Sequence, residues 1–156
     1  MTAAANGAGA ELHRLVGERL GERDQRYTAS RRQIIDAFAV LARPVTLPEL
    51  LTRAKGLAQS SAYRNLAVLE EAGAVRRLLH GADHAHYELA EDLTEHHHHL
   101  ICVECGLIRD ITLGSTLERS LDNALDGVAS AEGFTPTHHA IDIYGRCADC
   151  VPGPPA

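Results

Sequence analysis

The residues best suited to chemistry lie in one short stretch, Glu95–Gly106, which reads EHHHHLICVECG. Four consecutive histidines are followed by Cys102 and Cys105, a Cys-x-x-C pair. Imidazole and thiolate are strong ligands for transition-metal ions. A second pair, Cys147 and Cys150, follows a 41-residue spacer and completes the four cysteines of the chain. The stretch therefore predicts metal binding, and the rest of the chain must bring its partners to it.

The cysteines have three interpretations: buried thiols, disulfides or metal ligands. Two Cys-x-x-C pairs without a signal peptide fit a tetrahedral four-thiolate zinc site better than a secreted disulfide framework. We therefore predict one zinc site that is held by all four, Cys102, Cys105, Cys147 and Cys150.

The histidines predict two further sites if their segment is extended. Side chains alternate between the faces of a strand, so His97 and His99 point one way and His96 and His98 the other. One strand then supplies two imidazoles to each of two sites. The run is internal, unlike an affinity tag, and the alternative is a solvated polar loop.

Composition and charge divide the chain into two halves. Its 156 residues are 45% hydrophobic, enough for one domain or two small ones, and with 4% aromatic residues and no Trp the cores should be aliphatic. The net charge is −6, but residues 1–80 carry twelve Lys and Arg against eight Asp and Glu, whereas residues 81–156 carry three against thirteen. The balance of +4 favours a polyanionic partner for the first half, and −10 favours cations for the second.

The first half predicts a winged helix-turn-helix. Apolar residues at helical spacing, capping signals and alternation give helices over 11–22, 31–41, 47–54 and 59–72 and strands over 75–79 and 85–89. Ser30 and Ser60 are the expected N-caps of the second and fourth helices, and Thr46 with Glu49 forms a capping box before the third. The fourth helix stands in the position that reads DNA.

The second half predicts a small α/β domain. The pattern gives strands over 98–103, 107–112 and 138–144 and a helix over 116–131, a thin core that needs a metal or a second subunit. We expect a DNA-binding domain over 1–89, a hinge over 90–96 and a dimerisation domain over 97–156, with 1–9 and 151–156 disordered. No signal peptide and no run of roughly 18 apolar residues is present, so we expect a cytoplasmic protein.

The order of these parts resembles the ferric uptake regulator superfamily of metal-responsive transcription factors over Glu11–Cys150. The resemblance rests mainly on the histidine run with its two cysteine pairs, and also on RYTxxR at Arg26, AYRNL at Ala62, YEL at Tyr87 and HxIxIYG at His139. It implies an α+β protein: an N-terminal winged helix that reads operator DNA and a C-terminal α/β domain that holds a homodimer together.

The resemblance also assigns residues to DNA. Tyr63 and Arg64 should reach base edges in the major groove, where Arg grips guanine and Tyr contacts a thymine methyl group. Ser60, Ser61 and Asn65 should contact phosphate, and Arg26 the minor groove.

Three metal sites follow from the resemblance. The four cysteines hold a structural Zn2+. The regulatory site lies at the hinge. Some members draw one of its ligands from a position that is Pro44 here, and we expect His84 or His86 to replace that ligand. The full set of expected ligands is His84, His86, Glu88, His97, His99 and Asp110. An additional site uses His96, His98, Glu118 and His139, although Glu118 requires one extra residue before its helix and His138 is a neighbouring alternative to His139.

These parts imply a metal-dependent repressor of iron or zinc uptake genes, not an enzyme, that binds a palindromic operator as a homodimer. The regulatory ligands suit Fe2+ or Zn2+, and Mn2+ or Ni2+ also fit them. A peroxide-sensing Fe/Mn repressor and a metal-buffering protein without DNA binding are the alternatives. A zinc hydrolase with Glu95 as base is disfavoured, because the chain has no HExxH pattern.

Overall fold

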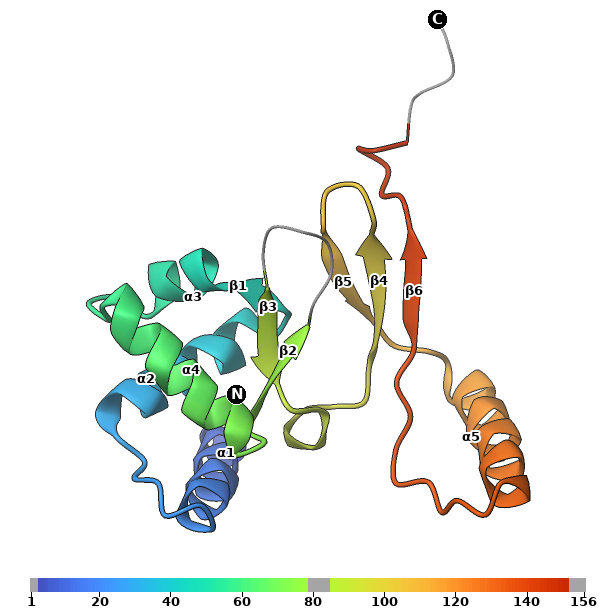
Figure 1. Ribbon diagram of the computed structural model, residues 1–156, viewed down its shortest axis with the longest axis horizontal. Helices are drawn as coiled ribbons and strands as arrows, with labels where there is room; N and C mark the ends of the chain where they lie inside the picture. The colour runs from blue at the N-terminus through green and yellow to red at the C-terminus, as the bar shows by residue number, and fades with distance from the viewer. Residues whose placement is uncertain (1–2, 79–84, 152–156) are drawn as a thin grey trace, which may run out of the picture. The chain divides into compact units, whose positions relative to one another are not determined.

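The computed structural model describes residues 3–78 and 85–151, which form two compact units of mixed helix and strand. The first unit extends to Glu95 and the second begins at His96. The predicted α+β class is confirmed (Figure 1). Within the described residues, no helix has the length and apolar character needed to cross a membrane.

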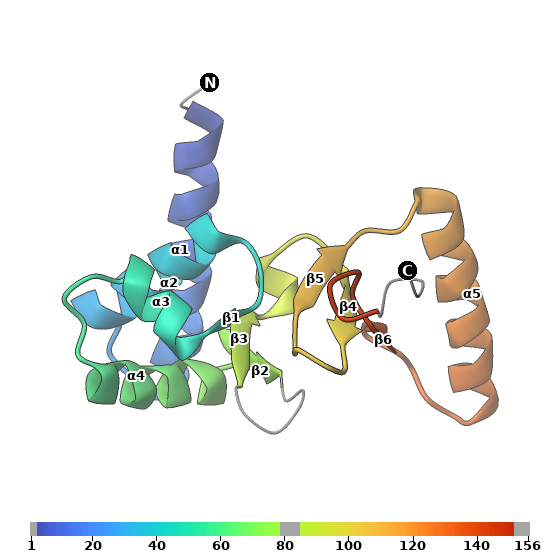
Figure 2. The same ribbon diagram turned by 90° about the horizontal axis from the view of Figure 1, so that it is seen from above.

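The first unit has four helices and a small sheet, and Figure 2 shows α2, α3 and α4 gathered together. Strand β3 lies between β1 and β2 and is antiparallel to both. The elements are α1 Ala3–Gly21, α2 Ala29–Leu41, β1 Val45–Thr46, α3 Leu47–Arg53, α4 Gln59–Glu71, β2 Val75–Leu78, β3 His86–Leu89 and a 3-10 turn, η1, Glu91–Leu93.

The core of this unit is mainly aliphatic, as the composition predicts. Leu20, Ile34, Leu50 and Leu66 come from four different helices and are at most 1% exposed, and the aromatic side chains of Phe38 and Tyr87 are buried with them. Each such side chain stabilises the fold by about 1.5–3 kcal/mol. The core thereby fixes which face of α4 looks outward.

Several helix boundaries differ from prediction. Helix α1 begins at Ala3 and not at Glu11, in keeping with the high helix propensity of Ala. The N-cap of α2 is Thr28, whose hydroxyl accepts from the Arg31 amide at 3.4 Å, and not Ser30. The N-cap of α4 is Ala58, so Ser60 lies inside the helix.

Two details concern the start of α3 and its connection to the wing, the hairpin of β2 and β3. The predicted capping box is present, because the Thr46 amide donates to the Glu49 carboxylate at 2.8 Å. Strand β1 was not predicted, since two residues carry no readable alternation. It pairs with β3, Val45 with Tyr87 and Thr46 with His86, and so places Pro44 beside β3.

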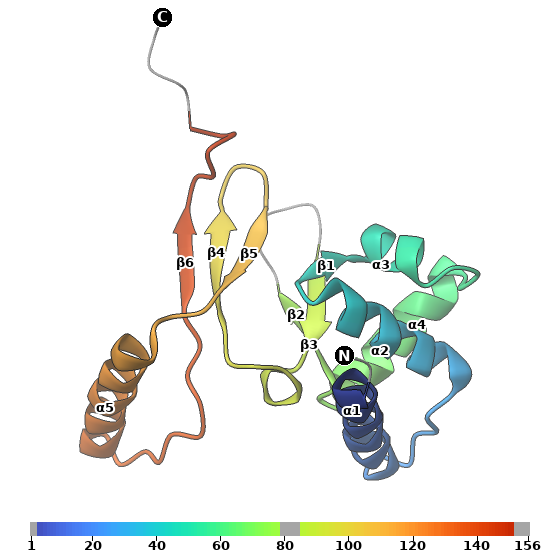
Figure 3. The same ribbon diagram turned by 180° about the vertical axis from the view of Figure 1, so that it is seen from behind.

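The second unit is a three-stranded sheet and one helix: β4 His98–Cys102, β5 Ile108–Ile111, α5 Ser115–Ala131 and β6 Asp142–Gly145. The central strand β4 is antiparallel to β5 and parallel to β6 (Figure 3). The predicted strand over 138–144 is shorter than expected, because pairing with β4 begins only where the His99 amide donates to the Ile141 carbonyl.

This unit buries very little. The buried side chains of its described part are Ile101, Cys102, Ile108 and two histidines, His98 and His99. Helix α5 buries none, and it lies to one side of the sheet in Figures 2 and 3. Its apolar side chains Leu117, Leu125 and Val128 are 39–66% exposed. A unit with so small a core needs further stabilisation.

Candidate metal centres and DNA-reading helix

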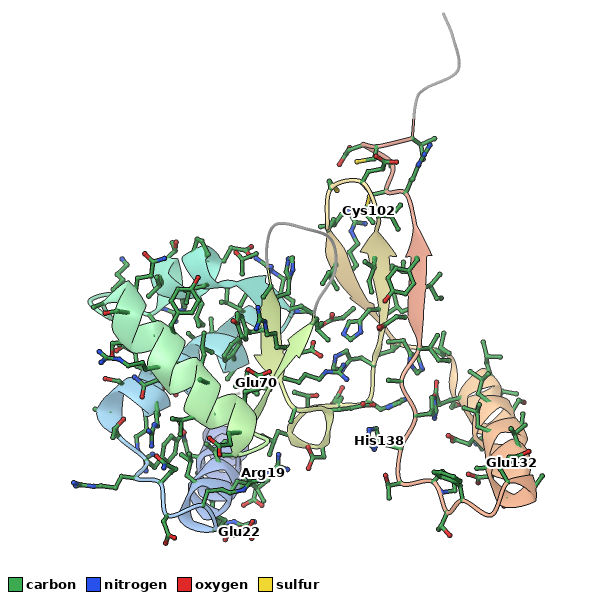
Figure 4. The ribbon with its side chains drawn as sticks, viewed as in Figure 1. Arg19, Glu22, Glu70, Cys102, Glu132 and His138 are labelled. Carbon is green, nitrogen blue, oxygen red and sulfur yellow. The ribbon has the colours of Figure 1, made fainter. Side chains whose placement is uncertain are left out.

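The four cysteines converge where two neighbouring strands end. Cys102 closes β4 and is paired with Gly145, the last residue of β6 (Figure 4). The turn after β4 brings Cys105 to this place, and the turn after β6 brings both Cys147 and Cys150. Gly106, at φ 73°, donates its amide to the Cys102 carbonyl and tightens the first turn. The four sulfurs lie within 4.8 Å of one another, and those of Cys105 and Cys147 are 3.7 Å apart.

The surroundings of these sulfurs favour a cation. Backbone amides of Cys105 and Cys147 donate to the Cys102 sulfur and lower its pKa to about 6. Hydrogen bonds to the Cys147 and Cys105 sulfurs raise the pKa of Cys150 to about 12. Four crowded sulfurs that cannot all ionise alone match the donor set of a tetrahedral zinc site, in which a metal would take the place of the protons.

A second cluster forms around Glu118, in the first turn of α5. His96 and His98 share one face of the extended segment, and their Nε2 atoms lie 2.8 and 3.3 Å from the two Glu118 oxygens. His139 Nε2 lies 2.9 Å from the same carboxylate. Burial alone would raise the pKa of Glu118, but the hydrogen bonds with His98 and His96 lower it. The extra residue before α5 therefore does not keep Glu118 from these histidines.

The neighbouring histidine is placed elsewhere. His138 lies on the segment between α5 and β6 (Figure 4), is exposed, and contacts the Thr137 hydroxyl at 3.2 Å. His139, and not His138, joins His96 and His98.

A third cluster lies on the opposite face of β4. Antiparallel pairing sets Asp110 of β5 opposite His99, and the His99 Nε2 atom is 3.8 Å from the Asp110 carboxylate. The rings of His97 and His99 stand edge to face with centroids 5.1 Å apart, and one ligand atom from each of the three residues lies within 4.8 Å of the others. Two imidazoles and one carboxylate suit a divalent transition metal.

Asp142 approaches the same histidine and was not predicted. Its Oδ1 atom lies 3.0 Å from His99 Nδ1, the ring nitrogen other than the one that faces Asp110. The sequence does show a carboxylate between Ile141 and Ile143, which could have marked Asp142 as a candidate. It does not show that His99 is the partner, because that contact depends on the parallel register of β6 with β4.

The remaining residues assigned to the regulatory site belong to the first unit. Glu88 of β3 is 4% exposed and forms an ion pair with Arg76 on β2. His86 is half-buried on the same strand, between Thr46 and Leu78. His84 lies outside the described residues.

Helix α4 presents the predicted reading face. Its Ala62, Leu66 and Leu69 side chains enter the core, whereas Tyr63 is 52% exposed and Arg64 is also exposed. Tyr63 is therefore not a core residue.

The other residues expected to contact DNA differ in their exposure and in their hydrogen bonds within the protein. Ser60 and Arg26 are exposed. Asn65 donates to the Ser61 hydroxyl at 3.2 Å and accepts from the Arg31 guanidinium at 3.2 Å. Ser61 and Asn65 thus already help to order the helix surface.

A winged helix joined to an α/β unit rich in metal ligands defines a class of metal-responsive DNA-binding regulator. The chain belongs to the ferric uptake regulator family, whose model matches residues 22–144. It is 33% identical over 140 residues to the ferric uptake regulation protein of Synechococcus elongatus, covering 84% of this chain and 89% of that protein. It is 28% identical over 137 residues to the peroxide operon regulator of Bacillus subtilis, covering 85% and 89%. The resemblance read from the motifs is confirmed.

Solved structures agree in fold. The ferric uptake regulator Fur of Helicobacter pylori, described as having three functional metal-binding sites, matches with a TM-score of 0.70 at 19% identity, covering 93% of this chain and 95% of that one. The manganese-bound regulator of Pseudomonas aeruginosa matches with a TM-score of 0.67 at 21% identity, covering 85% and 97%.

Proposed function

We propose that this protein is a metal-dependent repressor that binds a palindromic operator as a homodimer and controls metal uptake genes. The observation that carries the proposal is the alternation along His96–His99, the extended segment that leads into β4. Each face of this segment presents two histidines to a carboxylate, and four cysteines converge at the end of the same strand. The same chain carries a winged helix with an exposed Tyr63 and Arg64.

The four cysteines would hold a structural Zn2+ that ties the ends of β4 and β6 together. A homodimer is supported by the large apolar surface of the second unit, where Leu117, Val128 and Tyr144 are each more than half exposed. A second copy would cover these side chains and supply the core that one copy lacks.

The regulatory metal would be held by His97, His99 and Asp110, with Glu88 and either His84 or His86 supplied by the wing. Pro44 cannot bind a metal through its side chain, and β1 sets it beside the strand that carries His86 and Glu88. Ligands from the wing and from the second unit would let the metal set the orientation of the DNA-binding unit. Nitrogen and oxygen donors suit Fe2+ or Zn2+, with Mn2+ or Ni2+ also accommodated.

Peroxide sensing is a second candidate, supported by the similarity to the Bacillus subtilis peroxide operon regulator and by the same donor set. A repressor that loses DNA after peroxide treatment when loaded with Fe2+, but not when loaded with Mn2+, belongs to this second type.

DNA recognition would use only the first half of the chain, which carries the positive balance. Tyr63 and Arg64 would read bases, Ser60, Ser61 and Asn65 would contact phosphate, and Arg26 would enter the minor groove. The acidic second half would repel DNA. A metal bound there would therefore affect DNA binding by changing the orientation of the DNA-binding unit. Metal and DNA must then raise each other's affinity by the same factor.

The test uses the intact protein and DNA selected from a random pool in the presence of Fe2+, Zn2+, Mn2+ or Ni2+. We expect a palindrome to be enriched, with metal raising its affinity roughly 5–150-fold. Affinity should also fall steeply with salt, because phosphate contacts release counterions. Equal DNA affinity with and without metal rejects the mechanism, and metal uptake without any DNA preference supports a buffering protein.

Arg64→Ala tests the reading helix. A bidentate contact to guanine contributes about 1–3 kcal/mol of discrimination, so we expect operator affinity to fall roughly 5–150-fold and the preference for guanine at one position to relax. Fluorescence anisotropy with the selected operator and single-base variants measures both effects. Arg119→Ala, which removes the same charge from the exposed surface of α5, is the control and should bind normally. A uniform loss on all sequences would reassign Arg64 to phosphate.

A further inference from the structure

His99 is held between two carboxylates, one at each ring nitrogen. Its Nε2 atom faces Asp110 at 3.8 Å, and its Nδ1 atom lies 3.0 Å from Asp142. The ring is 1% exposed, so Nδ1 cannot turn to water. Parallel pairing sets His99 and Asp142 at matched positions on β4 and β6. The contact is therefore built into the register of the sheet.

The same arrangement recurs on the other face of β4. His139 directs Nε2 to Glu118 at 2.9 Å, and its Nδ1 atom lies 3.1 Å from Asp122. Asp122 stands one helical turn after Glu118 on α5, so both carboxylates project from the same side of the helix. Each histidine cluster thus contains one imidazole whose Nε2 atom faces the carboxylate of the cluster and whose Nδ1 atom contacts a second carboxylate.

We propose that Asp142 and Asp122 are positioning residues, one for each cluster, that hold His99 and His139 with Nε2 directed at the metal. A carboxylate that accepts from Nδ1–H selects the tautomer with a free Nε2 lone pair, fixes the ring and makes that nitrogen a better donor. This inference rests on the proposed metal function of the clusters.

The two carboxylates do not need these bonds for their own solvation. The Asp142 side chain is 33% exposed and that of Asp122 is 53% exposed. Substitution therefore removes a carboxylate that is already partly solvated, and its main consequence falls on the histidine, whose Nδ1 atom loses its partner.

The experiment separates the two clusters before testing either. In full-length protein with zinc at the cysteines, His96→Ala with His98→Ala leaves the His97, His99 and Asp110 cluster, and His97→Ala with His99→Ala leaves the Glu118 cluster. Co2+ is the probe, because its visible absorption reports both occupancy and ligand geometry. Asp142→Ala and Asp122→Ala are introduced into each background, and Co2+ affinity is measured by competition with a chelator.

We expect Asp142→Ala to weaken Co2+ binding about 10–100-fold at the His99 cluster and to leave the Glu118 cluster unchanged, with the converse for Asp122→Ala. Asp142→Asn should recover part of the loss, because its amide oxygen can still accept from Nδ1–H. In the absence of Co2+, the variants should still unfold cooperatively, as their backgrounds do.

Two results would overturn the inference. One is unchanged affinity in both Asp→Ala variants while the backgrounds bind Co2+ well. The other is an equal loss at both clusters in each variant, which would mark a general structural effect. If neither background binds Co2+, the proposed metal function itself fails, and the inference fails with it.

Discussion

Cys105→Ser is expected to remove one zinc ion per chain and to abolish the dimer. Ser cannot supply a thiolate, and the three remaining sulfurs lose the tetrahedral donor set that joins the turns after β4 and β6. Metal binding at such a site is coupled to folding. Because the described part of the second unit buries so few apolar side chains, and none from α5, it has little else to hold it together.

Zinc content by elemental analysis, together with light scattering during size-exclusion chromatography, measures both effects. Glu104→Ser is the matched control: it places the same residue in the same turn and removes only the exposed ion pair with Arg146. It should keep both zinc and dimer. A Cys105→Ser protein that elutes as a dimer with one fewer zinc would contradict a zinc-dependent dimer, and one that keeps its zinc would contradict the ligand assignment.

What could be read from the chain was mostly local. The apolar stripes of α2 and α4 have a period of 3.6 residues, so their buried residues were predictable from spacing alone. The division of the histidines into two pairs follows from the period of two along one strand. Helix caps were displaced by two residues. Thr28 and Ser30 are both good capping residues within one turn of the start of α2, whereas Ala58 has no side-chain oxygen that could cap α4, so local sequence favoured Ser60 over it.

The partners of the histidines were not local. Glu118 stands on α5, and His139 on the irregular segment before β6. Asp142 stands on β6 and is paired with His99 across 43 residues of sequence. Glu118 and His139 were named through resemblance to a family. Asp142 was missed, because no spacing rule predicts the register of a parallel pair whose connection is neither a hairpin nor a regular crossover.

His97→Ala together with His99→Ala is expected to keep the zinc and the dimer but to lose the effect of metal on operator binding. Both imidazoles of the Asp110 cluster are removed, so the remaining carboxylates bind Fe2+ or Zn2+ weakly. The cysteines lie beyond these residues at the far end of β4 and are untouched. The ratio of operator affinities with and without metal should fall from roughly 5–150 to about one.

The matched control is His96→Ala with His98→Ala, which removes the same number of rings from the same segment. Each pair contains one fully buried ring, His99 or His98, at 1% exposure, so the cavities created are comparable. Operator anisotropy across a metal titration, with the dimer verified by light scattering, compares the two. If the His96 and His98 variant loses the metal response and the His97 and His99 variant keeps it, the regulatory role belongs to the Glu118 cluster. If both lose it equally, the two faces of β4 form one coupled switch and not a sensor beside an accessory site.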